Sequence, residues 1–243
     1  MILANVRASL ERDDAQLALR LIARGSAAEL EAAEERLRDE GIDALLDDPR
    51  LLTALVGAPL GARSSLPLFC YVVVRHAMRQ AGEDDRVLCD YVASLLLHFG
   101  MRDRAHQIAP HDDEQYATLA ALLDDVDGPD ARRTFLVRAH LGNYALWLSG
   151  LFPDHIEYRS WRRGGPDLGY YEDLGRRGYQ LAAEHTLARE HGMASLFLAA
   201  AERFAALRIA LNRVSDTLLF PHHHTPDRLM RQVRDVMRYR LPS

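Results

Sequence analysis

The sequence predicts an all-α fold, a single-domain multi-helix bundle, and three observations lead to this prediction. Apolar residues recur at helical spacing along most of the chain. Capping residues and prolines stand where these segments begin, and strand patterning is scarce. The chain has 243 residues, of which 48% are hydrophobic, so it has ample material for one core.

The first predicted helix covers residues 5–24 and stops at Gly25, because glycine accepts the left-handed conformation that a helix end often needs. A second helix follows over residues 26–40. Ser26 and Glu29 have the spacing of a capping box, in which two side chains satisfy backbone donors at the helix start.

Pro49 suits the first turn of a short helix over residues 51–56, and a proline likewise opens the next helix, over residues 67–80. Residues 66–74 are rich in strand formers, but the helix-favouring residues that follow favour a helix. Another helix is predicted over residues 85–99.

Five further helices are predicted, over residues 112–125, 129–151, 168–187, 194–219 and 226–241. Residues 139–153 carry no formally charged side chain in a chain that is 27% charged. We therefore expect the helix over residues 129–151 to be the central, buried one. Thr225 and Pro226 suit the N-cap and first position of the last helix.

The helix over residues 194–219 carries a heptad seam, which consists of Phe197, Ala200, Phe204, Leu207, Leu211, Val214 and Leu218. Such a narrow seam favours a long helical partner. We expect that partner to be the helix over residues 129–151 of the same chain, the alternative being the same helix of a second copy.

Charge is distributed unevenly along the chain, whose formal net charge is −5. Residues 1–130 hold 24 acidic residues and 13 arginines, whereas residues 131–243 hold 11 and 17. In order of preference, this indicates two parts that pack on each other, self-association, or a basic surface for an acidic partner. We expect no nucleic-acid partner, because no binding module is visible.

The chain is predicted to be a cytoplasmic protein without a membrane anchor. Its apolar runs are shorter than the roughly 20 residues that cross a bilayer, and its N-terminal segment does not have the pattern of a secretion signal. Cys70 and Cys89 lie in apolar contexts without metal-ligand spacing, which suits reduced core thiols.

Three sequence blocks resemble a family of uncharacterised bacterial helical proteins. They are LCDYVASLLLHFG (residues 88–100), AHLGNYALWLSGLFPDHIEYR (residues 139–159) and GGPDLGYYEDLGRRGY (residues 164–179). The similarity extends over most of the chain from about Leu66. It implies a soluble helical protein, and it transfers no activity or catalytic residue.

The chain contains 11 histidines, but the sequence predicts neither a metal site nor a cofactor. His222, His223 and His224 are adjacent, and consecutive side chains diverge, so a solvated loop is favoured. His111 and Asp112 mimic a phosphohydrolase metal dyad without convincing partner ligands. No Glu-x-x-His motif occurs, which excludes a ferritin-like di-iron centre.

A small-molecule pocket is the second hypothesis, placed where Pro153 breaks the central helix. Polar and aromatic side chains converge there, and glycines at 175 and 178 permit a neighbouring helix to approach closely. The candidate ligand-binding residues are His140, Asn143, Trp147, His155, Tyr158, Arg159, Tyr171 and His185. The favoured alternative is that buried members such as His140, Asn143 and His185 satisfy one another as a structural network.

An anion site is the third hypothesis. Arg162 and Arg163 precede the start of the predicted helix over residues 168–187, where free N–H groups favour negative charge. A surface loop paired with the acidic half of the chain is favoured over this site.

No motif in the chain is diagnostic of catalysis. The first functional hypothesis is a non-enzymatic helical interaction or scaffold protein, with a homodimer as one form of such association. The alternative is a small-molecule-binding protein or enzyme with a pocket near residues 140–159. An accessible cavity beside His140, Tyr158 and Tyr171 would favour the alternative.

Overall fold

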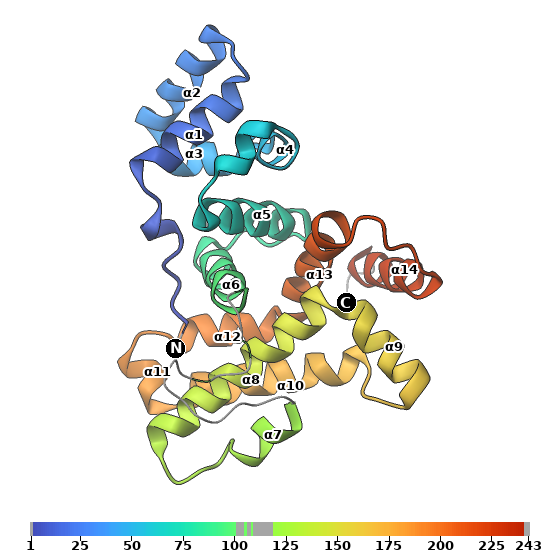
Figure 1. Cartoon of the computed structure of the whole chain (residues 1–243). Helices are drawn as coiled ribbons and strands as arrows, with labels where there is room; N and C mark the ends of the chain where they lie inside the picture. Colours follow the sequence, from blue (N-terminus) through green and yellow to red (C-terminus); the bar gives the residue numbers. More distant parts are fainter. Residues whose placement is uncertain (1, 101–104, 106–107, 109–118, 241–243) are drawn as a thin grey trace. The chain divides into compact units, whose positions relative to one another are not determined.

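The computed structural model describes residues 2–100, 105, 108 and 119–240, and every regular element in that part of the chain is a helix (Figure 1). The predicted all-α, multi-helix fold is therefore confirmed. Contacts group the chain into two compact units, within residues 2–102 and 103–243. A single domain over the whole chain stays a prediction.

The N-terminal unit is built from α1 (Arg12–Ala23), α2 (Ala27–Glu40), α3 (Ile42–Leu46), α4 (Pro49–Gly57), α5 (Leu66–Gln80) and α6 (Arg86–Phe99), with 3-10 turns at Arg7–Ser9 and Pro59–Arg63. Helices α5 and α6 pack on each other, and α1 packs on α2 and α4. The helix predicted through the strand-forming residues 66–74 is confirmed as α5.

The start of the first helix was predicted seven residues too early. Helix α1 begins at Arg12, because Glu11 and Asp14 form a reciprocal capping box there. Gly25 has the predicted left-handed backbone, with φ of 84°. Ser26 accepts a hydrogen bond from the Glu29 amide as predicted, but the Glu29 carboxylate pairs with Arg50.

Two consecutive ionisable residues of α5, Arg75 and His76, are buried in the N-terminal unit. Arg75 is fully buried and donates to Asp47 at 2.8 Å and to Asp84. His76 Nε2 lies 3.0 Å from the Leu46 carbonyl oxygen, and burial lowers the pKa of this imidazole. These contacts tie α5 to the segment around α3.

The C-terminal unit holds α7 (Leu119–Asp124), α8 (Ala131–Leu151), α9 (Pro153–Arg163), α10 (Leu168–Glu184), α11 (Thr186–Glu190), α12 (Ala194–Glu202), α13 (Phe204–Val214), a π-helical turn (Ser215–Leu219) and α14 (Pro226–Arg240). Residues 112–118 of the predicted helix over 112–125, and His111, lie outside the described residues. No helix in the described part combines the length and apolar composition needed to cross a bilayer.

Helix α8 is the predicted central helix of its unit, and it packs against α10 and α13 (Figure 1). The predicted close approach at two glycines of α10 is also confirmed. A Cβ atom at Gly178 would lie 2.6 Å from the Gly142 nitrogen of α8, and one at Gly175 would lie 2.2 Å from the Phe204 ring. Only glycine fits at these contacts.

The predicted helix over residues 194–219 is not continuous. It is broken at Arg203 into α12 and α13, and its end unwinds into the π-helical turn. The seam residues from Phe197 to Val214 are nevertheless buried within the unit. Because of the break, α12 packs on α10 while α13 packs on α8, so the seam has intramolecular partners.

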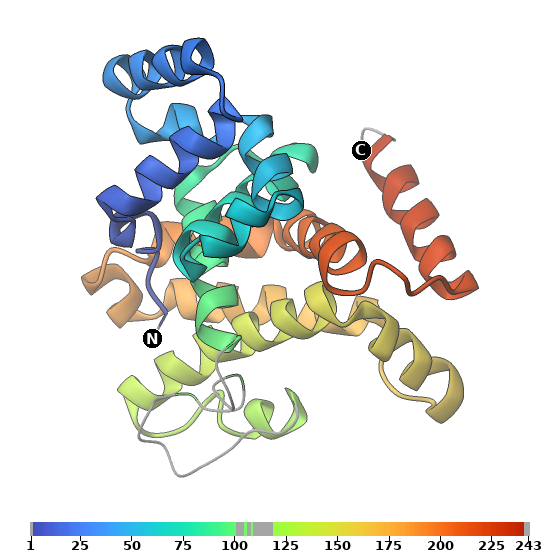
Figure 2. The ribbon, with the colours of Figure 1, turned by 45° about the horizontal axis from the view of Figure 1, so that its top comes forward.

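Two further differences concern the segments around α10. The helix predicted over residues 168–187 ends at Glu184, because His185 has an extended backbone and caps the short helix α11. Residues after Pro153, to which the sequence analysis assigned no helix, form α9. Helix α14 lies at the edge of the unit, beside α9 (Figure 2).

Candidate functional site

The break between α8 and α9 is stabilised by side chains of the α13 segment. Pro153 has no N–H, so the Ser149 carbonyl loses the donor that a continuing helix would supply. Asn212 Nδ2 donates instead to the carbonyl oxygens of Ser149 and the next residue, both at 2.7 Å. Ser215 Oγ donates to the Leu151 carbonyl at 2.7 Å. The carbonyl groups of residues 149–151 at the break are therefore all hydrogen-bonded.

A cavity of about 760 Å³ opens beside this break. Its apolar walls are formed by Leu151, Phe152, Pro153, Leu219, Phe220 and Pro221. Its polar lining consists of Asp154, His155, Tyr158, Ser215, His222, His223, Thr225 and Asp227. These residues come from the start of α9, the π-helical turn, the loop that follows it and the start of α14. Most of the exposed lining surface is nevertheless apolar, and a concave site that combines apolar surface with polar groups is typical of small-molecule binding.

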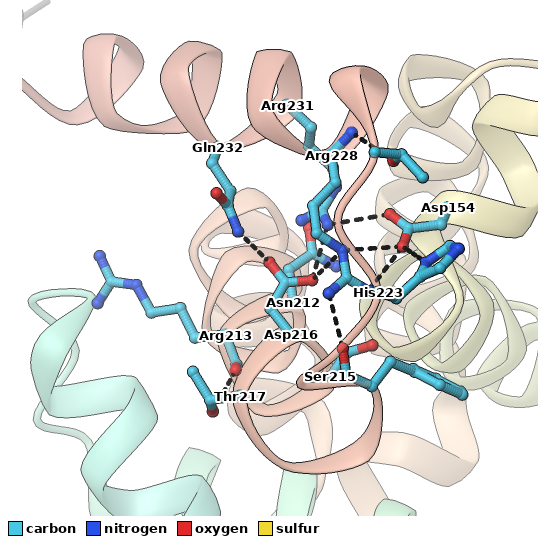
Figure 3. Close-up of polar contacts among 12 residues, drawn as sticks. Asp154, Asn212, Arg213, Ser215, Asp216, Thr217, His223, Arg228, Arg231 and Gln232 are labelled. Atoms are coloured by element: carbon cyan, nitrogen blue, oxygen red, sulfur yellow. Dashed lines mark hydrogen bonds and ion pairs between the residues drawn. The ribbon is translucent and has the colours of Figure 1, made fainter.

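Asp154, in the first turn of α9, joins the pocket to α14 (Figure 3). Its Oδ2 accepts from Arg228 at 2.7 and 2.9 Å and lies 2.9 Å from His223 Nδ1. Its Oδ1 accepts from Arg231 at 3.2 Å. Burial opposes ionisation of this carboxyl, but the hydrogen bonds and charges of its partners lower its pKa below the ordinary value.

Asp216 of the π-helical turn is the second carboxylate at this contact. Together, Asp154, Asp216, Arg228 and Arg231 form a buried charge cluster. Asp216 accepts from Arg231 at 2.8 Å and from Gln232 at 2.9 Å, and Arg228 lies 3.4 Å away (Figure 3). Two carboxylates thus balance two guanidinium groups that are 4% and 1% exposed as residues. Such compensation is what permits charges to be buried at all.

Helix α14 is attached through its polar side. Besides these arginines, Arg234 donates to Glu157 at 2.7 Å, and Asp235 accepts from the buried Arg208 at 2.7 Å. Its outer side chains are apolar and between 40% and 61% exposed, namely Leu229, Met230, Val233, Val236 and Met237. The helix therefore buries charged side chains and exposes apolar ones, which is the reverse of an ordinary amphipathic surface helix.

A second buried polar network lies between α10 and α13. Arg208, 3% exposed, donates to Glu172 at 2.7 Å and to Asn212 at 2.6 Å, as well as to Asp235. Since Asn212 also holds the carbonyls at the helix break, this network links α10, α13 and α14 to the wall of the pocket.

Of the predicted ligand-binding residues, His155 and Tyr158 line the pocket. Trp147 is half-buried and packs edge-on against the pocket residue Phe152, with ring centroids 5.8 Å apart. Arg159 is exposed on α9 and does not line the pocket.

His140 and Asn143 are buried elsewhere, in the interior of the unit. The His140 ring stacks on Tyr144, with centroids 5.9 Å apart. Asn143 Oδ1 accepts from the Tyr179 hydroxyl at 2.9 Å, a partner that the sequence analysis did not name. Neither residue lines the pocket, and the mutual network predicted for His140, Asn143 and His185 stays a prediction.

Tyr171 and His185 are also placed away from the pocket. Tyr171 is half-buried, and its ring lies edge-on to Tyr170 at 6.0 Å. His185 Nδ1 accepts from the Leu187 amide at 3.2 Å, and its ring lies 5.4 Å from Phe135. His185 is thus a helix cap.

Arg162 and Arg163 are exposed at the end of α9. The hypothesis required free N–H groups at the start of α10. However, the Asp167 carboxylate caps this helix and accepts a hydrogen bond from the Tyr170 amide at 2.9 Å. An anion there would face this carboxylate. The Tyr170 amide is thus already engaged, and the anion site stays a prediction.

The sequence analysis missed Phe220, Asp227, Arg228 and Arg231 as pocket or cluster residues. The available signal was the arginine face of the last helix, but periodicity alone does not say which face of a helix is buried. Among the described residues, no group of three or more His, Cys, Asp or Glu side chains is placed to hold a metal ion.

Comparison with known proteins adds no assignment: no family model, curated protein or solved structure matches this chain.

Proposed function

We propose that this protein binds a small organic molecule in the pocket at the break between α8 and α9. One observation carries the proposal: an open, mainly apolar cavity of about 760 Å³ stands beside a helix break whose backbone is satisfied by dedicated side chains. The resemblance to a family of bacterial helical proteins implies no activity, so it adds nothing to this choice.

Binding is favoured over catalysis because the polar groups that could act as catalytic residues already have partners within the protein. Asp154 and His223 resemble the pair in which a carboxylate supports a general base. However, Asp154 is shared with Arg228 and Arg231, which neutralise the charge that would stabilise an imidazolium. Ser215, the hydroxyl at the floor, is 1% exposed and already donates to a carbonyl.

Nile red, a neutral apolar dye whose emission rises in apolar sites, tests the proposal. We expect saturable binding with one dye per chain. Leu219→Trp should abolish it by filling the pocket, whereas Leu198→Trp should not, because Leu198 is equally exposed (49%) but lies on α12. Absent binding, or equal binding by both variants, would refute the proposal.

Self-association is a second candidate function, favoured by the outward apolar side of α14. Met230, Val233 and Met237 follow heptad spacing, which suits a helical partner. The occupant we propose is a second copy running antiparallel. With Met230 opposite Val233 of the second copy, the exposed apolar sides of the two α14 helices cover each other, and the reverse pair forms by symmetry.

Sedimentation equilibrium tests this candidate. The unmodified chain should dimerise reversibly, and Val233→Glu should be monomeric while Leu198→Glu, a charge on another exposed apolar position, should not change the mass. A monomeric unmodified chain at high concentration would exclude self-association through α14.

The cytoplasm of a bacterium is our proposal for location and source. It is supported by the family resemblance and by two free thiols, which suit a reducing compartment. Burial raises the pKa of Cys70 to about 11, so this thiol is unreactive at neutral pH.

A further inference from the structure

We infer that the pocket at the helix break selects organic cations, that is, amines or ammonium compounds with an apolar body. This inference rests on the proposed small-molecule binding. Among the described residues, the formally charged side chains that line the pocket are both acidic, Asp154 and Asp227, and no arginine lines it in a chain with 30 basic residues. The charge on the lining is therefore of one sign.

Asp227 is the carboxylate available to a ligand. Asp154 already accepts from two arginines and contacts His223, so its charge is compensated inside the protein. Asp227 is exposed in the first turn of α14 and has no ion pair with any described residue. A ligand ammonium would supply the missing counter-ion.

The aromatic side chains of the pocket suit the same ligand. The rings of Phe152 and Phe220 meet with centroids 6.4 Å apart and planes inclined by 59°, and Tyr158 of α9 also lines the pocket. Faces of aromatic rings attract cations, and a nearby carboxylate reinforces this attraction. The apolar body of the ligand would pack on Leu151 and Pro153 at the floor.

Backbone donors that might hold an anion are already engaged. The amides of His155 and Ile156, at the start of α9, donate to the Phe152 carbonyl at 3.1 and 3.3 Å. At the start of α14, the Arg228 amide donates to Thr225 Oγ1 at 3.1 Å. Thus neither helix N-terminus beside the pocket offers these donors to an anionic ligand.

Three probes with one carbon skeleton test the inference: 4-phenylbutylamine, 4-phenylbutan-1-ol and 4-phenylbutyrate. Each is titrated at neutral pH against the full chain loaded with Nile red, and dye displacement gives the Kd. The amine should bind about tenfold more tightly than the alcohol, and the acid should bind most weakly.

Asp227→Asn should remove the preference for the amine over the alcohol. Asp173→Asn is the matched control, since Asp173 is an exposed carboxylate on α10 outside the pocket, and it should keep the preference.

The outcomes separate this inference from the proposed function. If Nile red binds but the amine shows no advantage, cation selectivity is refuted and small-molecule binding stands. If the preference survives in Asp227→Asn, the role assigned to Asp227 is refuted. If neither the dye nor any probe binds, the proposed function itself fails.

Discussion

Replacing Asp154 with asparagine tests whether α14 is held by the buried charge cluster. The change leaves Arg228 and Arg231 facing one carboxylate, Asp216, in place of two. Removing one partner of a buried ion pair costs about 3–5 kcal/mol, and because the Asp154 side chain is 19% exposed, we expect the lower end, about 3 kcal/mol. That loss corresponds to a factor of about 100 in the folding equilibrium.

Tryptophan fluorescence is a selective assay for this loss. Both tryptophans of the chain, Trp147 and Trp161, belong to the C-terminal unit, so urea unfolding followed by their emission reports on that unit. Asp173→Asn, at an exposed carboxylate of the same unit, should change stability by less than about 0.5 kcal/mol. If both variants unfold at the same urea concentration, the cluster does not stabilise the unit.

The same reasoning predicts a pH dependence. The pKa of Asp154 is lowered in the folded state, so its contribution is present above its unfolded pKa of about 4 and is lost as pH falls through the folded value. The stability difference between the unmodified chain and Asp154→Asn should therefore shrink below about pH 4. A difference that grows on acidification would contradict the ion-pair account.

Three further predictions concern the packing and titration of buried groups. Gly178→Ala should destabilise the C-terminal unit by about 2 kcal/mol, because the new Cβ meets backbone of α8. Gly169→Ala, whose new Cβ would make only an ordinary 3.4 Å contact with the Asp167 side chain, should be neutral or slightly stabilising, and equal effects in tryptophan-detected unfolding would contradict the close packing. Tyr179→Phe should cost about 1–2 kcal/mol in the same assay, since buried Asn143 loses the hydroxyl from which it accepts; an unchanged midpoint would show that this bond contributes nothing. His76 should titrate below about pH 6.5, because burial lowers its pKa; the folded N-terminal unit then resists protonation and loses stability as pH falls through 6.5. An NMR titration of its ring with a midpoint at or above 6.5 would refute this prediction.

Local sequence signals determined much of the secondary structure. Gly25 adopts the left-handed backbone expected after the first helix, and Ser26 and Asp48 cap helices as residues of their type do. The uncharged run over residues 139–153 placed α8 at the centre of its unit correctly, since burying many charges there would be too costly. Pro153 likewise located the break where the pocket lies.

The tertiary structure alone decided which polar residues meet. His140 and Asn143 were expected near the pocket on the basis of helical spacing, but spacing gives a face of one helix and not the neighbour that covers it. The Asn143 partner, Tyr179, is 36 positions away. The heptad pattern also did not predict the helix break at Arg203. This break lets α12 and α13 pack against two different helices.

Helix α14 shows most clearly which features the sequence determines and which the tertiary structure decides. Its sequence determined that the helix has an arginine face and an apolar face. The spacing of the residues does not show which of these faces is buried, and the hydrophobic effect alone would bury the apolar face. The arginines are buried instead because Asp154 and Asp216, from distant parts of the chain, converge there and compensate their charge.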